Sequence, residues 1–282
     1  MLDGKRPNTV IAYRNAIAKL AENFSTPPDQ LTEQQVRQYL LHCRKKLALN
    51  SIRPILGAIK FFYRVTAPRQ WPTLDAMRLP KSRTVPKVLS PEKCWQIIHA
   101  ASALHLRAAM QVAFTCGLRS IDVRQLKPKN IHSDSRSLNI TNSKGGHQRR
   151  VPIPAATIDI LRQYWKEHRN PNWIFPSRAK LANIQNVDAP ISPRSLQRGI
   201  EKVLQSLGWS DQGIVFHTLR HSYATAMLDE GVNLKVLSGY LGHKNLQATE
   251  VYLHLTRRGD AQARQVVQRI FDQAQPKQRG EN

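Results

Sequence analysis

The sequence predicts a mainly α-helical protein of two domains: an all-helical N-terminal domain, and a larger, mostly helical C-terminal domain with a small antiparallel β-sheet. Apolar residues recur at spacings of three and four over positions 10–65 and 91–116, which is the period of a helix with one buried face. Between these regions the period is lost over 67–91, a stretch that contains five prolines. Two short β-type segments flank a Lys-Gly-Gly sequence at 144–146, a combination typical of a hairpin.

Residues 1–67 are predicted to form the N-terminal domain, a bundle of three helices. Thr9 or Asn8 can cap the first helix, because a short polar side chain accepts a hydrogen bond from an unpaired N–H group of the first turn. Thr32 followed by Gln35 resembles a capping box and marks the start of the second helix. The bundle also carries eight basic residues that we expect on its surface: Arg14, Lys19, Arg37, Arg44, Lys45, Lys46, Arg53 and Lys60.

The third helix is predicted over about 51–65, and residues 68–90 after it are predicted to form a basic, proline-rich linker. Proline stiffens such a segment because its ring fixes φ. Lys81, Arg83 and Lys87 give the linker cations that can lie along the phosphates of a nucleic acid.

Residues 91–282 are predicted to form the larger domain. It begins with helices over about 91–103 and 104–116. Short strands over 137–141 and 150–153 follow and form the hairpin. The remainder of the domain is predicted to be mainly helical.

The charge of the chain indicates a polyanionic partner. It has 43 Lys and Arg against 19 Asp and Glu, a net charge of +24. The 15 basic and 5 acidic residues before Pro86 give +10, and the 28 and 14 from Pro86 onward give +14. Basicity spread along the chain suits a surface that follows a nucleic acid, although charge alone does not distinguish DNA from RNA or from a merely basic surface.

Composition also argues against several classes of protein. Cys43, Cys94 and Cys116 are an odd, scattered set, which indicates neither a disulfide framework nor a structural zinc site. The N-terminus has no apolar core of signal-peptide type, and no run of about 18 apolar residues occurs. We therefore expect a cytoplasmic protein without membrane association.

Two groups near the middle of the chain have ordinary explanations when taken singly. Arg119 follows a Gly that ends a predicted helix, which is a common position for an arginine. Lys144 precedes a glycine pair, and a solvated turn lysine is the simpler interpretation. At a hairpin tip, however, its amine can also reach a ligand.

The helix predicted to open at His217 has a more specific pattern. His217 and Arg220 are three residues apart, so they share a face near the positively polarised N-terminus, where an anion binds well. His217 and His221 have the spacing of a helical metal pair. Thr218 stands where a zinc protease has Glu, so a metal site is disfavoured, and a structural role for His221 stays open.

Further along, Gly242 is predicted to end a helix just before His243. Tyr252 follows nine residues later between apolar neighbours, a setting in which a tyrosine is usually part of the core. None of these groups identifies a function when taken alone.

In this order, the groups resemble the tyrosine recombinase (phage integrase) family, which includes the Xer-type and integron integrases. The resemblance covers essentially the whole chain. It rests most strongly on the run His-Thr-Leu-Arg-His-Ser-Tyr-Ala-Thr from His217, on Leu-Gly-His243 and on Tyr252. It implies a SAM-like, core-binding N-terminal domain and a C-terminal catalytic domain.

The resemblance also implies roles for individual residues. Arg119 and Arg220 match the two phosphate-binding arginines, and Asp122, where the family commonly has Glu, is expected to support Arg119. The family pattern Lys-Gly…Arg-x-Val-Pro matches 144–152. Mild departures are Leu253-His254 in place of Thr-His and a lengthened loop over 178–193. The six catalytic positions implied are Arg119, Lys144, His217, Arg220, His243 and Tyr252.

The chemistry that follows is attack of Tyr252 on a DNA phosphate to give a 3′-phosphotyrosyl intermediate. Two guanidinium groups stabilise the charge that develops on the phosphate. His217 is expected to accept or orient the phenolic proton, Lys144 to protonate the leaving 5′-oxygen, and His243 to donate to a phosphate oxygen. Neither a metal ion nor ATP is required.

The resemblance further implies a homotetramer on two synapsed double-stranded DNA sites, with strand exchange through a Holliday junction. An amphipathic helix predicted over 260–274 suits docking on a neighbouring subunit or on its own domain. A mobile genetic element is a natural setting for such an enzyme.

Three other functions are compatible with part of this pattern. A type IB topoisomerase shares the phosphotyrosine chemistry, but the histidine pattern and the N-terminal bundle favour a recombinase. A DNA-binding regulator with a decayed site is disfavoured, because all six positions are present. A metal-dependent nuclease built on His217 and His221 lacks acidic ligands at a suitable spacing.

Overall fold

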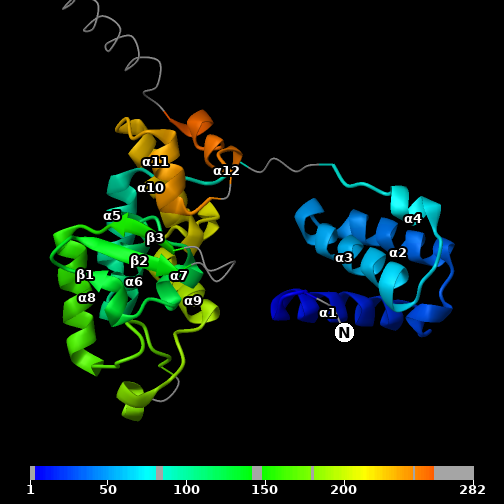
Figure 1. Ribbon diagram of the computed structural model, residues 1–282, viewed down its shortest axis with the longest axis horizontal. Helices are drawn as coiled ribbons and strands as arrows, with labels where there is room; N and C mark the ends of the chain where they lie inside the picture. Colours follow the sequence, from blue (N-terminus) through cyan, green and yellow to red (C-terminus); the bar gives the residue numbers. More distant parts are fainter. Residues whose placement is uncertain (1–3, 81–84, 142–147, 179–180, 244, 257–282) are drawn as a thin grey trace, which may run out of the picture. The chain divides into compact units, whose positions relative to one another are not determined.

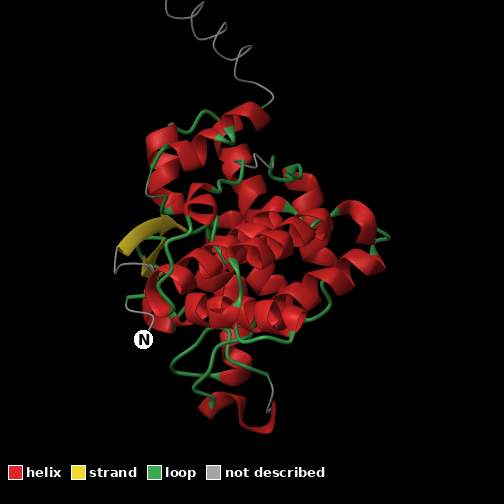
Figure 2. Ribbon diagram, turned by 90° about the vertical axis from the view of Figure 1, so that its right-hand side faces the viewer, coloured by secondary structure: helices red, strands yellow, loops and turns green. Residues whose placement is uncertain are grey.

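The computed structural model describes the chain except for residues 1–3, 81–84, 142–147, 179–180, 244 and 257–282 and the side chains of 181 and 182. It divides into two compact units, Met1–Thr84 and Val85–Asn282. Both units are built mainly of helices, and the described strands form one small sheet in the second unit, as predicted (Figure 1, Figure 2).

The first unit is a small helical bundle in which α1 and α2 pack against α3 (Figure 1). Its core contains the fully buried Leu20, Val36 and Ile59. The elements are α1 (Pro7–Phe24), η1 (Pro28–Gln30), α2 (Glu33–Lys46), α3 (Leu49–Phe61), the π-helical turn η2 (Phe62–Thr66) and α4 (Pro72–Ala76).

The ends of the first two helices test the predicted caps. α1 begins at Pro7, so the caps predicted at Thr9 and Asn8 are wrong. Proline suits the first helical position because its φ is already helical and its missing N–H needs no partner there. The capping box of α2 is confirmed: the Thr32 hydroxyl accepts from the Gln35 N–H at 3.3 Å, and Gln35 Oε1 accepts from the Thr32 N–H at 2.9 Å.

Part of the predicted linker belongs to the first unit. Leu74 of α4 is buried in the core of this unit, and Trp71 packs on Tyr63 with ring centroids 4.2 Å apart. Lys60 Nζ donates to the carbonyl oxygens of Asp75 at 2.9 Å and Met77 at 2.7 Å. The prediction of a linker from residue 68 onward missed this packing, because prolines can start a short helix as well as extend a chain.

The second unit surrounds α6, which packs against α5, α8, α9 and α10. α6 is buried on several sides, and its small residues Ala108, Ala109 and Ala113 let these helices approach closely. The helices are α5 (Pro91–Ala100), α6 (Leu104–Thr115), α7 (Ser120–Arg124), α8 (Ala155–His168), α9 (Pro193–Ser206), α10 (Phe216–Asp229), α11 (Leu234–Leu241) and α12 (Gln247–Glu250). The 3₁₀ turns are η3 (Pro128–Asn130), η4 (Leu181–Asn186), η5 (Ser210–Gln212) and η6 (Leu253–Leu255).

The sheet contains the predicted hairpin. Strands β1 (Ile131–His132), β2 (Ser137–Thr141) and β3 (Gln148–Pro152) are antiparallel in that order. β3 starts two residues before the predicted start at 150. Its pairing with β2 extends to Gln148, which lies opposite Thr141. The segment that joins β2 to β3, which includes Lys144, lies outside the described residues.

Within the described parts of the chain, every helix is too short or too polar to cross a membrane.

Candidate active site

Arg220 is the most deeply buried charge of the second unit, with 1% of its surface exposed. It lies in the second turn of α10, where Nη1 donates to the Gly117 carbonyl and Nη2 to the Leu241 carbonyl, both at 2.7 Å. Nη2 also lies 3.0 Å from Nε2 of His243. Among the described residues no carboxylate is within ion-pair distance of Arg220. Its positive charge is therefore available to an anion.

Arg119 stands at the start of α7, where Gly117 turns the chain at the end of α6. Gly117 has a φ of +60°, and a Cβ there would lie 2.4 Å from Cδ1 of Tyr223, so only glycine fits without displacing its neighbour. The Arg119 Nη2 donates to the Gly242 carbonyl at 3.3 Å. Both arginines thus contact the segment around Gly242, which places the two guanidinium groups in one cluster.

The cluster of Arg119 and Arg220 carries excess positive charge. Burial, followed by the nearby Arg119, lowers the pKa of Arg220 to about 9. Burial also lowers the pKa of Arg119, and Asp122 opposes this shift. A bound phosphate would relieve the repulsion between the two guanidinium groups.

Asp122 is buried and takes part in two interactions. Its Oδ2 accepts from the main-chain N–H of Arg119 at 3.0 Å and forms an ion pair with Arg149 Nη2 at 2.6 Å. The expected support of Arg119 therefore reaches its backbone, and the ion pair is with Arg149. Arg149 also donates from Nε to the Tyr240 carbonyl at 2.8 Å, which ties β3 to α11.

His243 follows Gly242, whose φ of +62° ends α11 as predicted. A guanidinium group only donates, so Nε2 of His243 accepts from Arg220, and the ring proton is on Nδ1. Nδ1 then donates to Oγ1 of the buried Thr249 at 2.7 Å. Burial, followed by Arg220 and Arg119, lowers the pKa of His243 to about 4. His243 is thus neutral near pH 7, with both ring nitrogens engaged inside the protein.

Tyr252 lies between α12 and η6 with 2% of its surface exposed. Its Oη is 2.8 Å from Nδ1 of His221, and its ring lies nearly parallel to that of His243, with centroids 6.4 Å apart. Burial raises the pKa of the Tyr252 phenol, whereas Arg220 and Arg119 lower it. The phenol is therefore within electrostatic reach of both arginines.

The chain matches known protein families over both of its units. Residues 87–258 match the model of the phage integrase family, and residues 1–73 match that of the phage integrase N-terminal SAM-like domain. The first match alone covers more than half of the 282-residue chain. The chain belongs to the phage integrase family, the tyrosine recombinases. It is accordingly a DNA strand-exchange enzyme.

Individual members of this tyrosine recombinase family are moderately similar to the chain. A putative integrase/recombinase of Sinorhizobium fredii is 29% identical over 251 residues, which are 88% of this chain and 79% of that protein. The tyrosine recombinase XerA of Pyrococcus horikoshii is 26% identical over 258 residues, 90% of this chain and 86% of that protein.

Solved structures of tyrosine recombinases share the fold. The XerH recombinase bound to its difH substrate has a TM-score of 0.71 and 19% identity, over 92% of this chain and 80% of that one. A lambda integrase dimer bound to a core site has a TM-score of 0.70 and 22% identity, over 88% and 72% of the two chains.

Of the six positions inferred for a tyrosine recombinase, the structure brings Arg119, Arg220, His243 and Tyr252 together. Lys144 lies outside the described residues. His217 is on the first turn of α10, but it does not make the expected contact with Tyr252. Its ring instead meets that of His221 edge-on, with centroids 4.6 Å apart.

Three members of this site were not predicted from the sequence. His221, which contacts Tyr252, was weighed only as a metal ligand or a structural residue, although its spacing of four from His217 places it on the same helical face. Arg149 was present in the family pattern Arg-x-Val-Pro without a role. Nothing in the local sequence pointed to Thr249.

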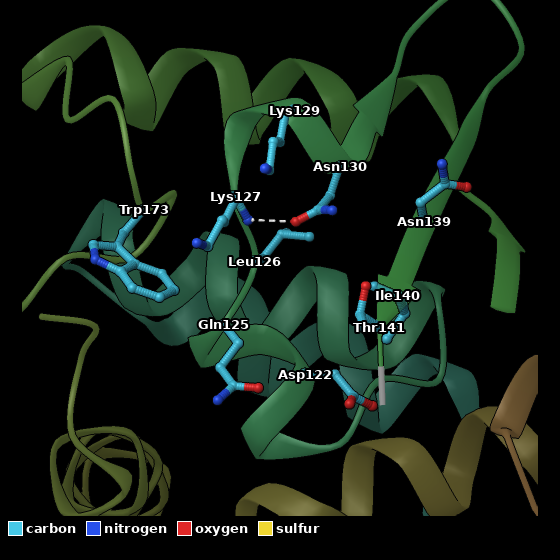
Figure 3. Close-up of a pocket in the computed structure, with 10 residues that line it drawn as sticks. All are labelled: Asp122, Gln125, Leu126, Lys127, Lys129, Asn130, Asn139, Ile140, Thr141 and Trp173. Atoms are coloured by element: carbon cyan, nitrogen blue, oxygen red, sulfur yellow. Dashed lines mark hydrogen bonds between the residues drawn. The ribbon is translucent and has the colours of Figure 1, made fainter. Parts of the chain in front are cut away.

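A cavity of about 430 Å³ adjoins the site on the other side of Asp122 (Figure 3). Lys127 and Lys129 line it together with Asn130 and Trp173. The Lys127 amine lies 4.6 Å from the Trp173 ring centroid, a cation–π contact that orients it. Two lysines therefore line this cavity beside the arginine cluster, together with apolar groups such as Leu126 and Ile140.

The cations predicted to bind DNA differ in their surroundings. Those exposed at the surface are Arg14, Lys19, Arg37, Arg44, Lys45, Lys46, Arg53 and Lys87. Lys60 is half-buried, and both Lys60 and Arg53 donate to main-chain carbonyls of 75–80, Arg53 to that of Pro80. These two hold α4 and the residues after it to the first unit. Lys81 and Arg83 lie outside the described residues.

Proposed function

We propose that this chain is a site-specific recombinase that uses Tyr252 to cleave DNA and hold the 3′ end as a phosphotyrosine. The observation that carries the proposal is the phenol of Tyr252 beside two arginines, one of them buried with no carboxylate partner among the described residues. A buried, uncompensated guanidinium group is costly unless an anion binds it, and a phosphodiester is such an anion.

The chemistry follows from the charges. Attack on phosphorus increases the negative charge on the non-bridging oxygens, and Arg119 and Arg220 can neutralise this charge from fixed positions. Removing one such donor typically costs about 10²–10³ in rate. Lys144 on the hairpin is proposed to protonate the leaving 5′-oxygen. His243 is proposed to donate to the phosphate from Nε2, after the anion has displaced its bond with Arg220 and Nε2 has taken up a proton.

The energy of the broken phosphodiester bond is kept in the phosphotyrosine. A free 5′-hydroxyl can therefore attack this bond and rejoin the strand without ATP. A hydrolase would lose this energy to water, whereas a recombinase transfers the end to another strand. The donors named above also allow the reaction to proceed without a metal ion.

We further propose double-stranded DNA as the partner, bound by the exposed cations of the first unit and by Lys127 and Lys129 beside the active site. Four copies would act on two synapsed sites, and strand exchange would pass through a Holliday junction. The segment 260–274, which lies outside the described residues, is a candidate link between neighbouring copies. We expect the enzyme to act in the cytoplasm, with mobile DNA as its substrate.

The deciding experiment is covalent trapping with the Tyr252→Phe variant. The full chain is first used to select its preferred sequence from a pool of random duplexes. The probe is a nicked duplex that carries this selected sequence. The unaltered chain should give an adduct that survives denaturation, and Tyr252→Phe should bind the duplex equally well but give none. An adduct in the variant, or a requirement for magnesium, would overturn the scheme. Relaxation of plasmids that lack the selected sequence would indicate a topoisomerase.

A further inference from the structure

His221 makes the only hydrogen bond to the Tyr252 hydroxyl that is found among the described residues. Nδ1 of His221 lies 2.8 Å from Oη of Tyr252, and the ring centroids are 5.6 Å apart. The two residues are 31 positions apart in the sequence, so this contact depends on the fold. His221 also lies within electrostatic reach of Arg220, and thus near the proposed phosphate site.

The direction of this hydrogen bond follows from burial. If Nδ1 of His221 carried the proton and donated it, the phenolic O–H of Tyr252 would be left without an acceptor. Only 2% of the surface of Tyr252 is exposed, so water would not replace that acceptor. Buried hydroxyl groups are nearly always paired, because an unmade hydrogen bond costs about 1–3 kcal/mol. Tyr252 is therefore the donor, and His221 is the neutral tautomer with its proton on Nε2.

We propose that His221 positions the Tyr252 hydroxyl and accepts its proton when the oxygen attacks DNA. This inference rests on the proposed function, since it names the proton acceptor of that reaction. The Oη–P bond forms, the P–O5′ bond breaks, and the phenolic proton moves to Nδ1 of His221. The 5′-oxygen takes a proton from a separate donor, for which Lys144 is the candidate, and rejoining reverses each transfer.

The surroundings of His221 make it a better acceptor when DNA is bound. The groups that face it are His217 and Arg220 of α10, Tyr252 after α12, and His243 after α11. In the free chain, burial followed by the charge of Arg220 lowers the pKa of His221 to about 4. A phosphodiester beside Arg220 adds negative charge, which favours the imidazolium. Proton acceptance is thereby coupled to the presence of substrate.

His221→Asn tests this role, because the amide oxygen can take the place of Nδ1 as an acceptor but cannot hold the proton. His221→Leu removes the acceptor as well. His99→Asn, at an exposed position on α5, is the matched control. The readouts are the affinity for the selected nicked duplex and the single-turnover rate of adduct formation. The rate is also measured on a duplex with a 5′-bridging phosphorothiolate at the cleavage site. Its leaving group is a sulfur, which needs no proton.

We expect both His221 variants to bind DNA as the parent does and to form adduct about 10²–10⁴ times more slowly. The loss of rate should persist with the phosphorothiolate, because the variants impair the attacking Tyr252 hydroxyl and not the leaving group. In His221→Asn the rate should also rise about tenfold per pH unit above neutrality, as the phenol ionises without help. His99→Asn should match the parent.

Two results would overturn the role of His221: a rate for His221→Asn within threefold of the parent, or a defect that the phosphorothiolate abolishes. The second result would place His221 on the leaving group. If the parent chain itself gave no Tyr252-dependent adduct, the proposed function would fail instead, and the two failures are thus separable.

Discussion

His243 is held by two hydrogen bonds of opposite direction, which together determine its protonation. It accepts from Arg220 through Nε2 and donates to Thr249 through Nδ1. The ring therefore has one tautomer and one orientation beside the proposed phosphate site. Thr249, which is fully buried, contacts His243 through its hydroxyl, and its carbonyl accepts from the N–H of Tyr252 at 3.0 Å.

At this scale we predict the effect of Thr249→Val, which keeps the shape of the side chain but removes the hydroxyl. The buried Nδ1–H loses its acceptor, so the free energy of unfolding should fall by about 1–3 kcal/mol. Partners that orient metal-bound histidines contribute about 10–100-fold, and we expect a loss of this size in the rate of adduct formation.

Urea unfolding, single-turnover kinetics and ¹⁵N NMR of the His243 tautomer would test this prediction. Thr249→Ser restores the hydroxyl and should recover most of both losses. A valine variant with the parent's stability, rate and tautomer would show that Thr249 does not orient His243.

At the scale of elements, the site depends on how α6 ends. Gly117 stops α6 with a positive φ, its carbonyl accepts from Arg220, and Arg119 follows two residues later. The ring of Tyr223 on α10 packs so closely that there is no room for a side chain at 117. A single turn thus sets the spacing between α6, α7 and α10.

We predict that Gly117→Ala lowers the free energy of unfolding by about 2–4 kcal/mol, the sum of left-handed strain and the contact with Tyr223. Gly213→Ala is the matched control, because Gly213 has a φ of +62° but no atom within 4 Å of the added Cβ. The control should lose only about 1–2 kcal/mol. Equal losses in the two variants, measured by urea unfolding, would contradict the packing argument.

At the scale of the whole molecule, several half-buried histidines make stability depend on pH. Burial is the main reason that the pKa values of His105, His221 and His243 are lowered to about 4. Between the unfolded value of about 6.5 and these folded values, the unfolded chain binds more protons. The stabilisation is thus complete above pH 6.5 and is lost as the pH falls to 4.

We therefore predict that the free energy of unfolding decreases as the pH is lowered from 6.5 to 4, by up to about 1.4 kcal/mol per pH unit for each such histidine. Tryptophan fluorescence can follow urea unfolding here, because four of the five tryptophans lie in the second unit. His105→Asn should reduce the slope of the free energy of unfolding against pH by the contribution of one histidine. A flat profile over this range would show that these rings are solvated.

The sequence by itself determined the helical character of both units, the hairpin, the capping box at Thr32 and the family to which the chain belongs. These features are encoded by neighbouring residues, through the period of apolar side chains, turn-forming glycines and short motifs such as the one from His217. Local spacing is sufficient for them, because the interactions that create them span only a few residues.

Only the tertiary structure decided which of two histidines on one face of α10 meets Tyr252, that Asp122 pairs with Arg149, and that 71–79 pack on the first unit. Each of these contacts joins residues many positions apart, at distances set by the packing of whole elements. His217 and His221 lie on one helical face and have the same chemistry, so the sequence offers no basis for choosing between them. The position of η6 against α10 makes that choice, since it places the Tyr252 oxygen 2.8 Å from His221.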